Sequence, residues 1–347
     1  MKRLYNLDYL RGLAALGIFF YHYFSWTFGK PHANMILGRI GVYGVSIFYI
    51  LSGLTLYLVY HSKITNSKID VLDFFKKRIF RIYPLLWLAI ISSTLISAKW
   101  PGLFNLFSNL SGLFGFINWD GYLATGAWSI GNELVFYAFF PLFIYSMCKS
   151  RHLFIILSVL IFLIYIFFAF NVFNPNIHLT DQWTNYVNPL NQIFLFLGGI
   201  LIGYVFEKIE INKYLVIAIL LIGICLYVFY PSENDAISIV FGWSRLVFTL
   251  SCFMICYSFY KMNIIVPSII NKPLMFFGEI SYSLYLLHPI VYTLIGIILT
   301  YSSSYFKLPT FSHLVISIIL SIVVSYFSYN YFEKYFIKMA KSKNEIK

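Results

Sequence analysis

Apolar residues dominate the chain in long runs that short polar segments separate. Ten runs approach or exceed the roughly 20 residues that an α-helix needs to cross the hydrocarbon core of a bilayer. They fall near 8–26, 41–60, 81–98, 128–147, 152–171, 190–206, 213–230, 238–260, 275–299 and 311–333. The pattern predicts an all-α integral membrane protein of about ten transmembrane helices, forming a single polytopic domain over residues 1–347.

The lysines and arginines alternate between the two sides of this predicted bundle. Twenty of the 25 lie at the termini and in the loops after the second, fourth, sixth and eighth runs, counting those at the helix ends. Cytoplasmic loops carry the positive excess in membrane proteins. We therefore expect both termini in the cytoplasm.

Composition excludes a soluble protein. The 347 residues are 60% hydrophobic and only 11% charged, whereas soluble domains carry about 25% charged residues. The net charge of +12 belongs to the inner face, where it suits anionic lipid or an anionic cytoplasmic ligand rather than nucleic acid. The four cysteines lack zinc or disulfide spacing, and no metal site is expected.

The first apolar run contains two ionisable residues, Arg11 and His22. Eleven helical steps of about 100° place both side chains on one side of the helix, about 16 Å apart along its axis. Such groups are costly inside a membrane and are functional candidates by default. The run also lacks a small-residue cleavage site after its apolar core, so we do not expect a cleaved signal peptide.

Two further segments carry small, polar or charged residues at informative positions of predicted helices. The second run contains GVSIFYILSG, in which Ser52 and Gly53 suit close helix packing. The next cytoplasmic loop ends in KKRIFRIYP, where Arg78 and Arg81 share a helix face and suit phosphate binding. Helix packing alone and an ordinary positive-inside anchor are the respective alternatives.

The fourth run begins AWSIGNELVFYAFFP. Ser129, Glu133 and Tyr137 recur every four residues, which aligns a hydroxyl, a carboxylate and a phenol. An unpaired carboxylate there is expensive, and pairing with a structural arginine such as Arg245 is the alternative to a functional role.

The ninth run contains GEISYSLYLLHPIV. Ser281, Tyr285 and His288 follow the spacing of one helix face. A hydrogen-bonded core histidine is the alternative interpretation of His288.

Together these segments resemble the acyltransferase family 3 membrane proteins, which acylate sugars of O-antigens, exopolysaccharides and other glycans. The resemblance covers nearly the whole chain, in order, and rests on five motifs: the Arg11/His22 pair, FYILSG at 48–53, RIFRIYP at 78–84, WSIGNELVFYAFFP at 128–141 and GEISYSLYLLH at 278–288.

The resemblance implies O-acyl transfer from cytoplasmic acyl-CoA, most often acetyl-CoA, to a carbohydrate hydroxyl on the outer side of a bacterial inner membrane. Acyl-CoA is then a co-substrate, and no bound cofactor is expected. We assign the donor phosphates to Arg11, Arg78 and Arg81. His22 is the candidate general base, and Glu133 is expected to orient its ring or stabilise its protonated form. The candidates for tunnel lining or oxyanion stabilisation are Ser52, Ser129, Tyr137, Tyr282, Tyr285 and His288.

Two features depart from the family pattern. Members often end the last helix with Glu, a basic residue and Pro, whereas this chain has Glu333, Lys334 and Tyr335. Many members also carry a soluble esterase-like domain after the membrane part. We expect this chain to resemble the short form without it.

The outer loops hold polar and aromatic side chains suited to a carbohydrate acceptor, possibly a lipid-linked one. Trp119, Asp120 and Trp183 are the candidates, because tryptophan stacks on sugar rings and carboxylates bind hydroxyls. Interfacial anchoring of the aromatics is the alternative.

The main competing function is a flippase or transporter of lipid-linked oligosaccharide or polysaccharide. Transporters tend to have internal repeats with helices broken at matching positions, and we find neither in this sequence. A glycan polymerase would not need the predicted arginine cluster.

Overall fold

The computed structural model describes residues 4–64, 68–262, 266–302 and 310–341, and within these ranges the chain is helical, with no strand. The long helices are α1 (Tyr5–Phe28), α2 (Ile36–Tyr60), α3 (Lys68–Ser97), α6 (Ala127–Lys149), α7 (Arg151–Phe167), α9 (Pro189–Phe206), α10 (Lys213–Phe229), α12 (Gly242–Lys261), α13 (Ser268–Ser302) and α14 (Thr310–Phe327).

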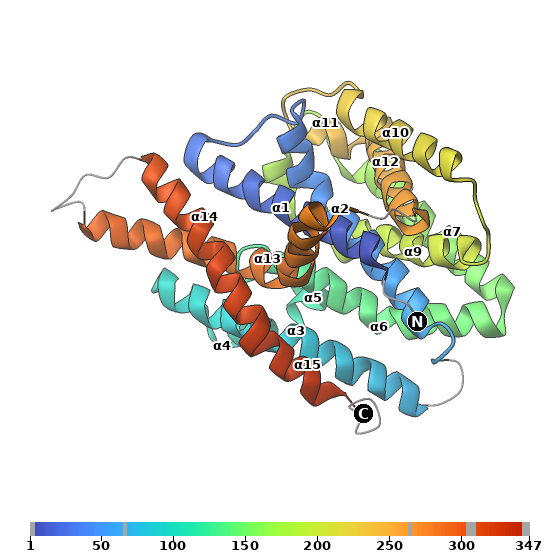
Figure 1. Ribbon diagram of the computed structural model, residues 1–347, viewed down its shortest axis with the longest axis horizontal. Helices are drawn as coiled ribbons and strands as arrows, with labels where there is room; N and C mark the ends of the chain where they lie inside the picture. Colours follow the sequence, from blue (N-terminus) through green and yellow to red (C-terminus); the bar gives the residue numbers. More distant parts are fainter. Residues whose placement is uncertain (1–3, 65–67, 263–265, 303–309, 342–347) are drawn as a thin grey trace.

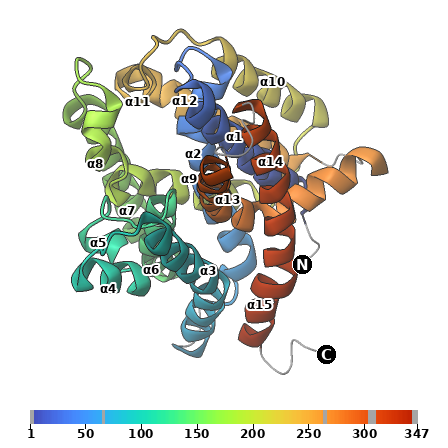
Figure 2. The same cartoon turned by 90° about the vertical axis from the view of Figure 1, so that its left-hand side faces the viewer.

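Short elements join them. These are α4 (Leu103–Ser111), α5 (Phe114–Ile117), η1 (Phe168–Val172), η2 (Leu179–Gln182), α8 (Trp183–Tyr186), α11 (Ile237–Val240), η3 (Ser328–Glu333) and α15 (Lys334–Ala340). The N-terminal end of α1 and the C-terminal end of α15 lie toward the same side of the molecule (Figures 1 and 2).

Each of the ten predicted runs falls on one of the long helices. Seven segments of the described chain are long and apolar enough to cross a membrane: Ile36–Tyr60, Ile69–Ser97, Ala127–Lys149, Arg151–Val172, Pro189–Phe206, Ser268–Tyr301 and Phe311–Ala340. Helix α10 is shorter, with 17 residues, and α1 and α12 each carry an arginine inside an otherwise apolar helix. The protein is therefore an all-helical membrane protein, while the number of ten spans stays a prediction.

Helix α2 is at the centre of the bundle. It packs along α9 on one side and α1 on the other, and α1 in turn packs along α13 (Figure 1). The apolar stretch of α2 is 83% buried inside the protein, compared with 17% for the stretch from Phe311 to Ala340. Helix α2 is thus positioned to line an internal site.

Glycines bring α2 and α9 into close contact. A Cβ on Gly53 would lie 1.9 Å from the carbonyl oxygen of Phe196, and a Cβ on Gly199 would lie 2.0 Å from that of Ile50. These distances leave no room for any side chain, so both glycines are required by the packing. The close approach predicted for Gly53 is confirmed.

The last long helix changes geometry before its end. Helix α14 passes into the π-helical segment η3 and then into α15. Within η3, Glu333 turns inward, is buried, and accepts a hydrogen bond from Ser283 of α13. Single-turn π segments are frequently found at functional sites, and this one connects the C-terminal helix to the helix that carries His288.

Candidate active site

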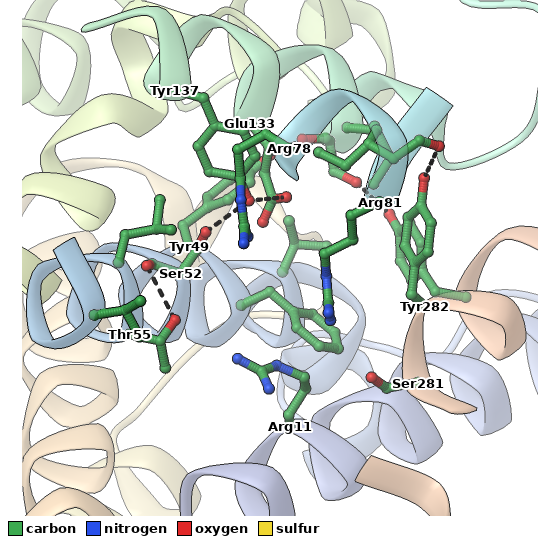
Figure 3. Close-up of a pocket in the computed structure, with 18 of the residues that line it drawn as sticks. Arg11, Tyr49, Ser52, Thr55, Arg78, Arg81, Glu133, Tyr137, Ser281 and Tyr282 are labelled. Carbon is green, nitrogen blue, oxygen red and sulfur yellow. Dashed lines mark hydrogen bonds between the residues drawn. The ribbon is translucent and has the colours of Figure 1, made fainter. Parts of the chain in front are cut away.

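A cavity of about 260 Å³ opens beside the C-terminal half of α2, from Val45 to Tyr60. We call it the arginine cavity, because Arg11 of α1 and Arg78 and Arg81 of α3 line it together. Figure 3 shows the three side chains extending from two helices toward one space. Arg11 is paired with Asp8 at 3.1 Å, and the guanidinium of Arg78 lies 5.8 Å from the ring centre of Tyr60.

Helix α6 supplies the carboxylate of this cavity. Tyr137 donates a hydrogen bond to Glu133 (2.6 Å), and the Ser52 hydroxyl lies 2.9 Å from that of Tyr137 (Figure 3). Serine, tyrosine and glutamate therefore form one chain of hydrogen bonds across α2 and α6. The alternative that Arg245 pairs with Glu133 is wrong, because Arg245 binds Asn191 instead.

A second cavity, of about 620 Å³, lies at the other end of α2. We call it the histidine cavity, after His22 in its wall. Its lining includes Trp26 of α1, Trp183 of α8 and the segment from Lys30 to Ala33 between α1 and α2. This cavity is larger than the arginine cavity, and three tryptophans, Trp26, Trp128 and Trp183, contribute to its lining.

The two cavities meet at a pair of residues. Val45 of α2 and Tyr285 of α13 line both. On one side of this junction α2 contributes residues as far as Tyr60 to the arginine cavity. The fifteen helical steps from Val45 to Tyr60 span about 22 Å along the axis of α2. The arginine and histidine cavities therefore lie in sequence along one helix, with their shared wall near its middle.

His22 is held by a second histidine. Its Nδ1 lies 2.8 Å from Nε2 of His288, and Nδ1 of His288 lies 2.7 Å from the carbonyl oxygen of Leu284. A carbonyl can only accept, so neutral His288 carries its proton on Nδ1 and presents an unprotonated Nε2. His22 then donates from Nδ1, which leaves its own Nε2 without a proton. This tautomer is the one that a general base requires.

Glu133 does not occupy the place that the sequence predicted for it. Its hydrogen bond is with Tyr137, and it lines the arginine cavity, whereas His22 lines the histidine cavity and bonds to His288. The expectation that Glu133 orients His22 is therefore corrected. Periodicity places Glu133 and His22 on the faces of their own helices but does not show which helices face each other.

The remaining predicted residues divide between three places. Those that line the arginine cavity are Ser52, Ser129, Tyr137, Tyr282 and Tyr285, and Trp183 lines the histidine cavity with Tyr285. Trp119 donates to the Thr184 carbonyl oxygen and Asp120 accepts from the Thr184 hydroxyl. Trp119 and Asp120 thus connect the loop before α6 to helix α8 through hydrogen bonds, and they line neither cavity.

Sequence reasoning missed two aromatic residues of the site. The Trp26 ring is stacked beside His22, with centroids 5.1 Å apart and planes at 18°. The hydroxyl of Tyr49 accepts a hydrogen bond from Asn132 and lines the arginine cavity. The sequence holds a clue to each residue. Trp26 is one helical turn beyond His22, and Tyr49 lies within the FYILSG motif.

An ion pair joins two loops at the histidine cavity. Nδ1 of His178 lies 2.5 Å from a carboxylate oxygen of Asp235. This hydrogen bond and the negative charge raise the pKa of His178 above its ordinary value. Partial burial raises the pKa of Asp235, but hydrogen bonds from the Ile237 amide and from His178 outweigh this effect and keep that pKa below its ordinary value. Among the described residues, no three histidine, cysteine or acidic side chains are grouped so that they could hold a metal ion.

The sequence also matches a known family. Residues 4–330 match the profile described as an acyltransferase domain, that of acyltransferase family 3. The chain belongs to this family. The resemblance expected from the five motifs is confirmed over nearly the whole chain.

Individual relatives are distant. The chain is 25% identical over 321 residues to the O-acetyltransferase OatA of Staphylococcus aureus, covering 82% of this chain and 50% of OatA. It is 27% identical over 302 residues to "Putative acetyltransferase ORF330" of Acidianus two-tailed virus, covering 83% of each. The chain thus spans about half the length of OatA. No solved structure matches it.

Proposed function

We propose that this membrane acyltransferase moves an acyl group, acetyl above all, from cytoplasmic acyl-CoA to a hydroxyl of a cell-surface or exported carbohydrate. One observation carries the proposal. A cavity lined by three arginines and a cavity lined by an oriented histidine share the wall formed by Val45 and Tyr285. A donor with a phosphorylated end and an acceptor that must lose a proton require these two environments.

The proposed orientation follows from charge. We place ten spans in a bacterial inner membrane with both termini in the cytoplasm, which puts the N-terminal ends of α1 and α3 on the cytoplasmic side. The arginine cavity then faces the acyl-CoA pool. The histidine cavity faces outward, together with the loops that carry Lys30, His178 and Asp235.

Phosphate binding is the role proposed for Arg11, Arg78 and Arg81. Guanidinium groups form short, charge-assisted hydrogen bonds with phosphate oxygens. The pantetheine arm of acyl-CoA would extend from these groups along α2 toward Tyr285, and the thioester would reach the junction between the cavities.

The proposed reaction is a direct transfer. Nε2 of His22 accepts the proton of the acceptor hydroxyl, and the oxygen attacks the thioester carbonyl carbon. A C–O bond forms, the C–S bond breaks, and the proton passes from His22 to the departing sulfur, which gives CoA as the free thiol. Donation from Nδ1 to His288 keeps the ring in place through both proton transfers. The Ser129 hydroxyl is the candidate for stabilising the oxyanion, and Tyr285, whose own hydroxyl donates to the Gly126 carbonyl oxygen, is proposed to line the tunnel.

Binding of radiolabelled acetyl-CoA to the purified protein tests the donor site. Arg78→Ala should weaken binding about 10-fold or more, because a hydrogen bond to a charged group contributes about 1.5–3 kcal/mol. Lys76→Ala removes a positive charge from the same helix at an exposed position outside the cavity lining and is the matched control.

Equal affinity for the two variants would contradict the donor site. Transport of a lipid-linked glycan by the purified protein, without transfer of acyl label, would favour the flippase alternative instead.

A further inference from the structure

Tyr285 is fixed in place at the junction of the two cavities. Its hydroxyl donates to the carbonyl oxygen of Gly126 (3.1 Å) and lies 2.8 Å from the hydroxyl of Ser129. The ring is buried and packs against the backbone at Gly126, where a Cβ would lie 3.3 Å from it. Two hydrogen bonds and this contact hold the ring to the N-terminal end of α6.

The Tyr285 ring also connects the two chemical environments. It packs in an edge-to-face manner with Phe48 of the arginine cavity, with ring centroids 6.1 Å apart and planes at 64°. On the same face of α13, the His288 ring is 6.5 Å away and holds His22. An acyl group that reaches His22 from the arginine cavity must therefore lie against Tyr285 and against Val45, the other residue that lines both cavities.

We propose that Val45 and Tyr285 set the length of the transferred acyl chain, so that the junction admits an acetyl group and rejects longer straight chains. This inference rests on the proposed function. Helix α2 is almost entirely buried around Val45, and Tyr285 is tied to α6. Neither side chain can move aside easily, so each additional methylene of the acyl chain would have to fit against closely packed protein.

The expected preference for acetyl-CoA over longer acyl-CoAs follows from the selectivity of close-fitting apolar pockets. One extra methylene in a close-fitting apolar pocket changes kcat/KM by about 10- to 200-fold. The wild-type protein should use propionyl-CoA at least about 10-fold less well than acetyl-CoA, and butyryl-CoA less well again. Val45→Ala removes two methyl groups from the junction and should raise the propionyl-to-acetyl ratio of kcat/KM about 10-fold.

The assay uses membrane vesicles from cells that carry the gene, so that their own glycans are the acceptors. Radiolabelled acetyl-, propionyl- and butyryl-CoA are supplied in turn, and label in the glycan is measured. Val135→Ala is the matched control, because Val135 is a buried valine of α6 outside both cavity linings. It should leave the ratio unchanged.

Tyr285→Phe provides a second variant that keeps the ring and loses both hydrogen bonds. It should also raise the propionyl-to-acetyl ratio, by less than Val45→Ala. If Val45→Ala does not fold, the propionyl-to-acetyl ratio of Tyr285→Phe alone tests the inference.

An unchanged ratio in every folded junction variant, with acetyl transfer intact, overturns the inference and leaves the proposed function standing. A wild-type protein that uses the three donors equally also overturns it. Absence of glycan label from wild type with any acyl-CoA would contradict the proposed function itself.

Discussion

The orientation of a single imidazole is the central feature at the scale of residues. The sequence identified His22 and His288 separately, because each is an ionisable group on an apolar helix. It did not pair them, since periodicity defines the face of a helix but not the helix that it faces. The structure brings together two rings that are 266 positions apart and fixes the proton on Nδ1 of each.

Replacing His288 by leucine should lower kcat about 100-fold or more, because general base catalysis contributes about 10²–10⁴ and depends on the correct tautomer. Affinity for acetyl-CoA should not change, since His288 lines neither cavity. His288→Gln keeps an amide oxygen that can accept from His22 and should recover part of the rate. Transfer rates and acetyl-CoA binding of both variants check this, and full activity of His288→Leu would remove the proposed role.

At the scale of elements, hydropathy was sufficient to locate the long helices and insufficient for the rest. The ten predicted runs fall on ten helices, because each is long enough for apolar residues to dominate. The short helices α5, α8 and α11 have four residues each, too few to show a periodic pattern, and α4 has nine, too few to cross a membrane. The π-helical segment η3, which buries Glu333, is likewise set by tertiary contacts.

The contact between α2 and α9 gives a test at this scale. Gly53→Ala places a Cβ against the Phe196 carbonyl and should destabilise the protein by about 1–3 kcal/mol, as overpacking does. Gly296→Ala, on α13, is the control, because its Cβ would meet only ordinary contacts at 3.5 Å. Melting temperatures of the purified variants in detergent check this. Equal melting temperatures would show that the helices separate without cost.

The ion pair between His178 and Asp235 joins the loop before α8 to the loop before α11. His178 has a raised pKa, so its contribution to stability is complete below the ordinary value of 6.5 and is lost as pH rises through the raised value. Asp235 has a lowered pKa, so its contribution is complete above 3.8 and is lost as pH falls through the lowered value. The pair is therefore strongest between pH 3.8 and 6.5.

The melting temperature of wild type relative to His178→Gln checks this pH dependence. The advantage of wild type should be largest within the pH range of full pairing and should decrease as pH rises above 6.5. Because His178 is 73% exposed, the difference should be small and reduced by salt. A difference that grows with rising pH would contradict the pairing.

At the scale of the whole molecule, one buried helix connects two cavities of different chemistry. The sequence supplied the family, the membrane class and most of the polar residues of the site. It could not divide those residues between two cavities, because that division depends on how α1, α2, α6 and α13 pack. Glu133 belongs with the arginines and His22 with His288, and in the proposed mechanism this arrangement separates donor binding from proton removal.

The measurement that tests this account most directly is mass spectrometry of surface glycans from cells that lack the gene. The cells are complemented with wild type or with His22→Ala, and membrane insertion of both proteins is verified. We predict that wild type restores the mass of an acyl group on the glycan and that His22→Ala does not. Equal acylation with the two proteins would contradict the role of His22, and glycans of unchanged mass but altered amount would contradict acyl transfer.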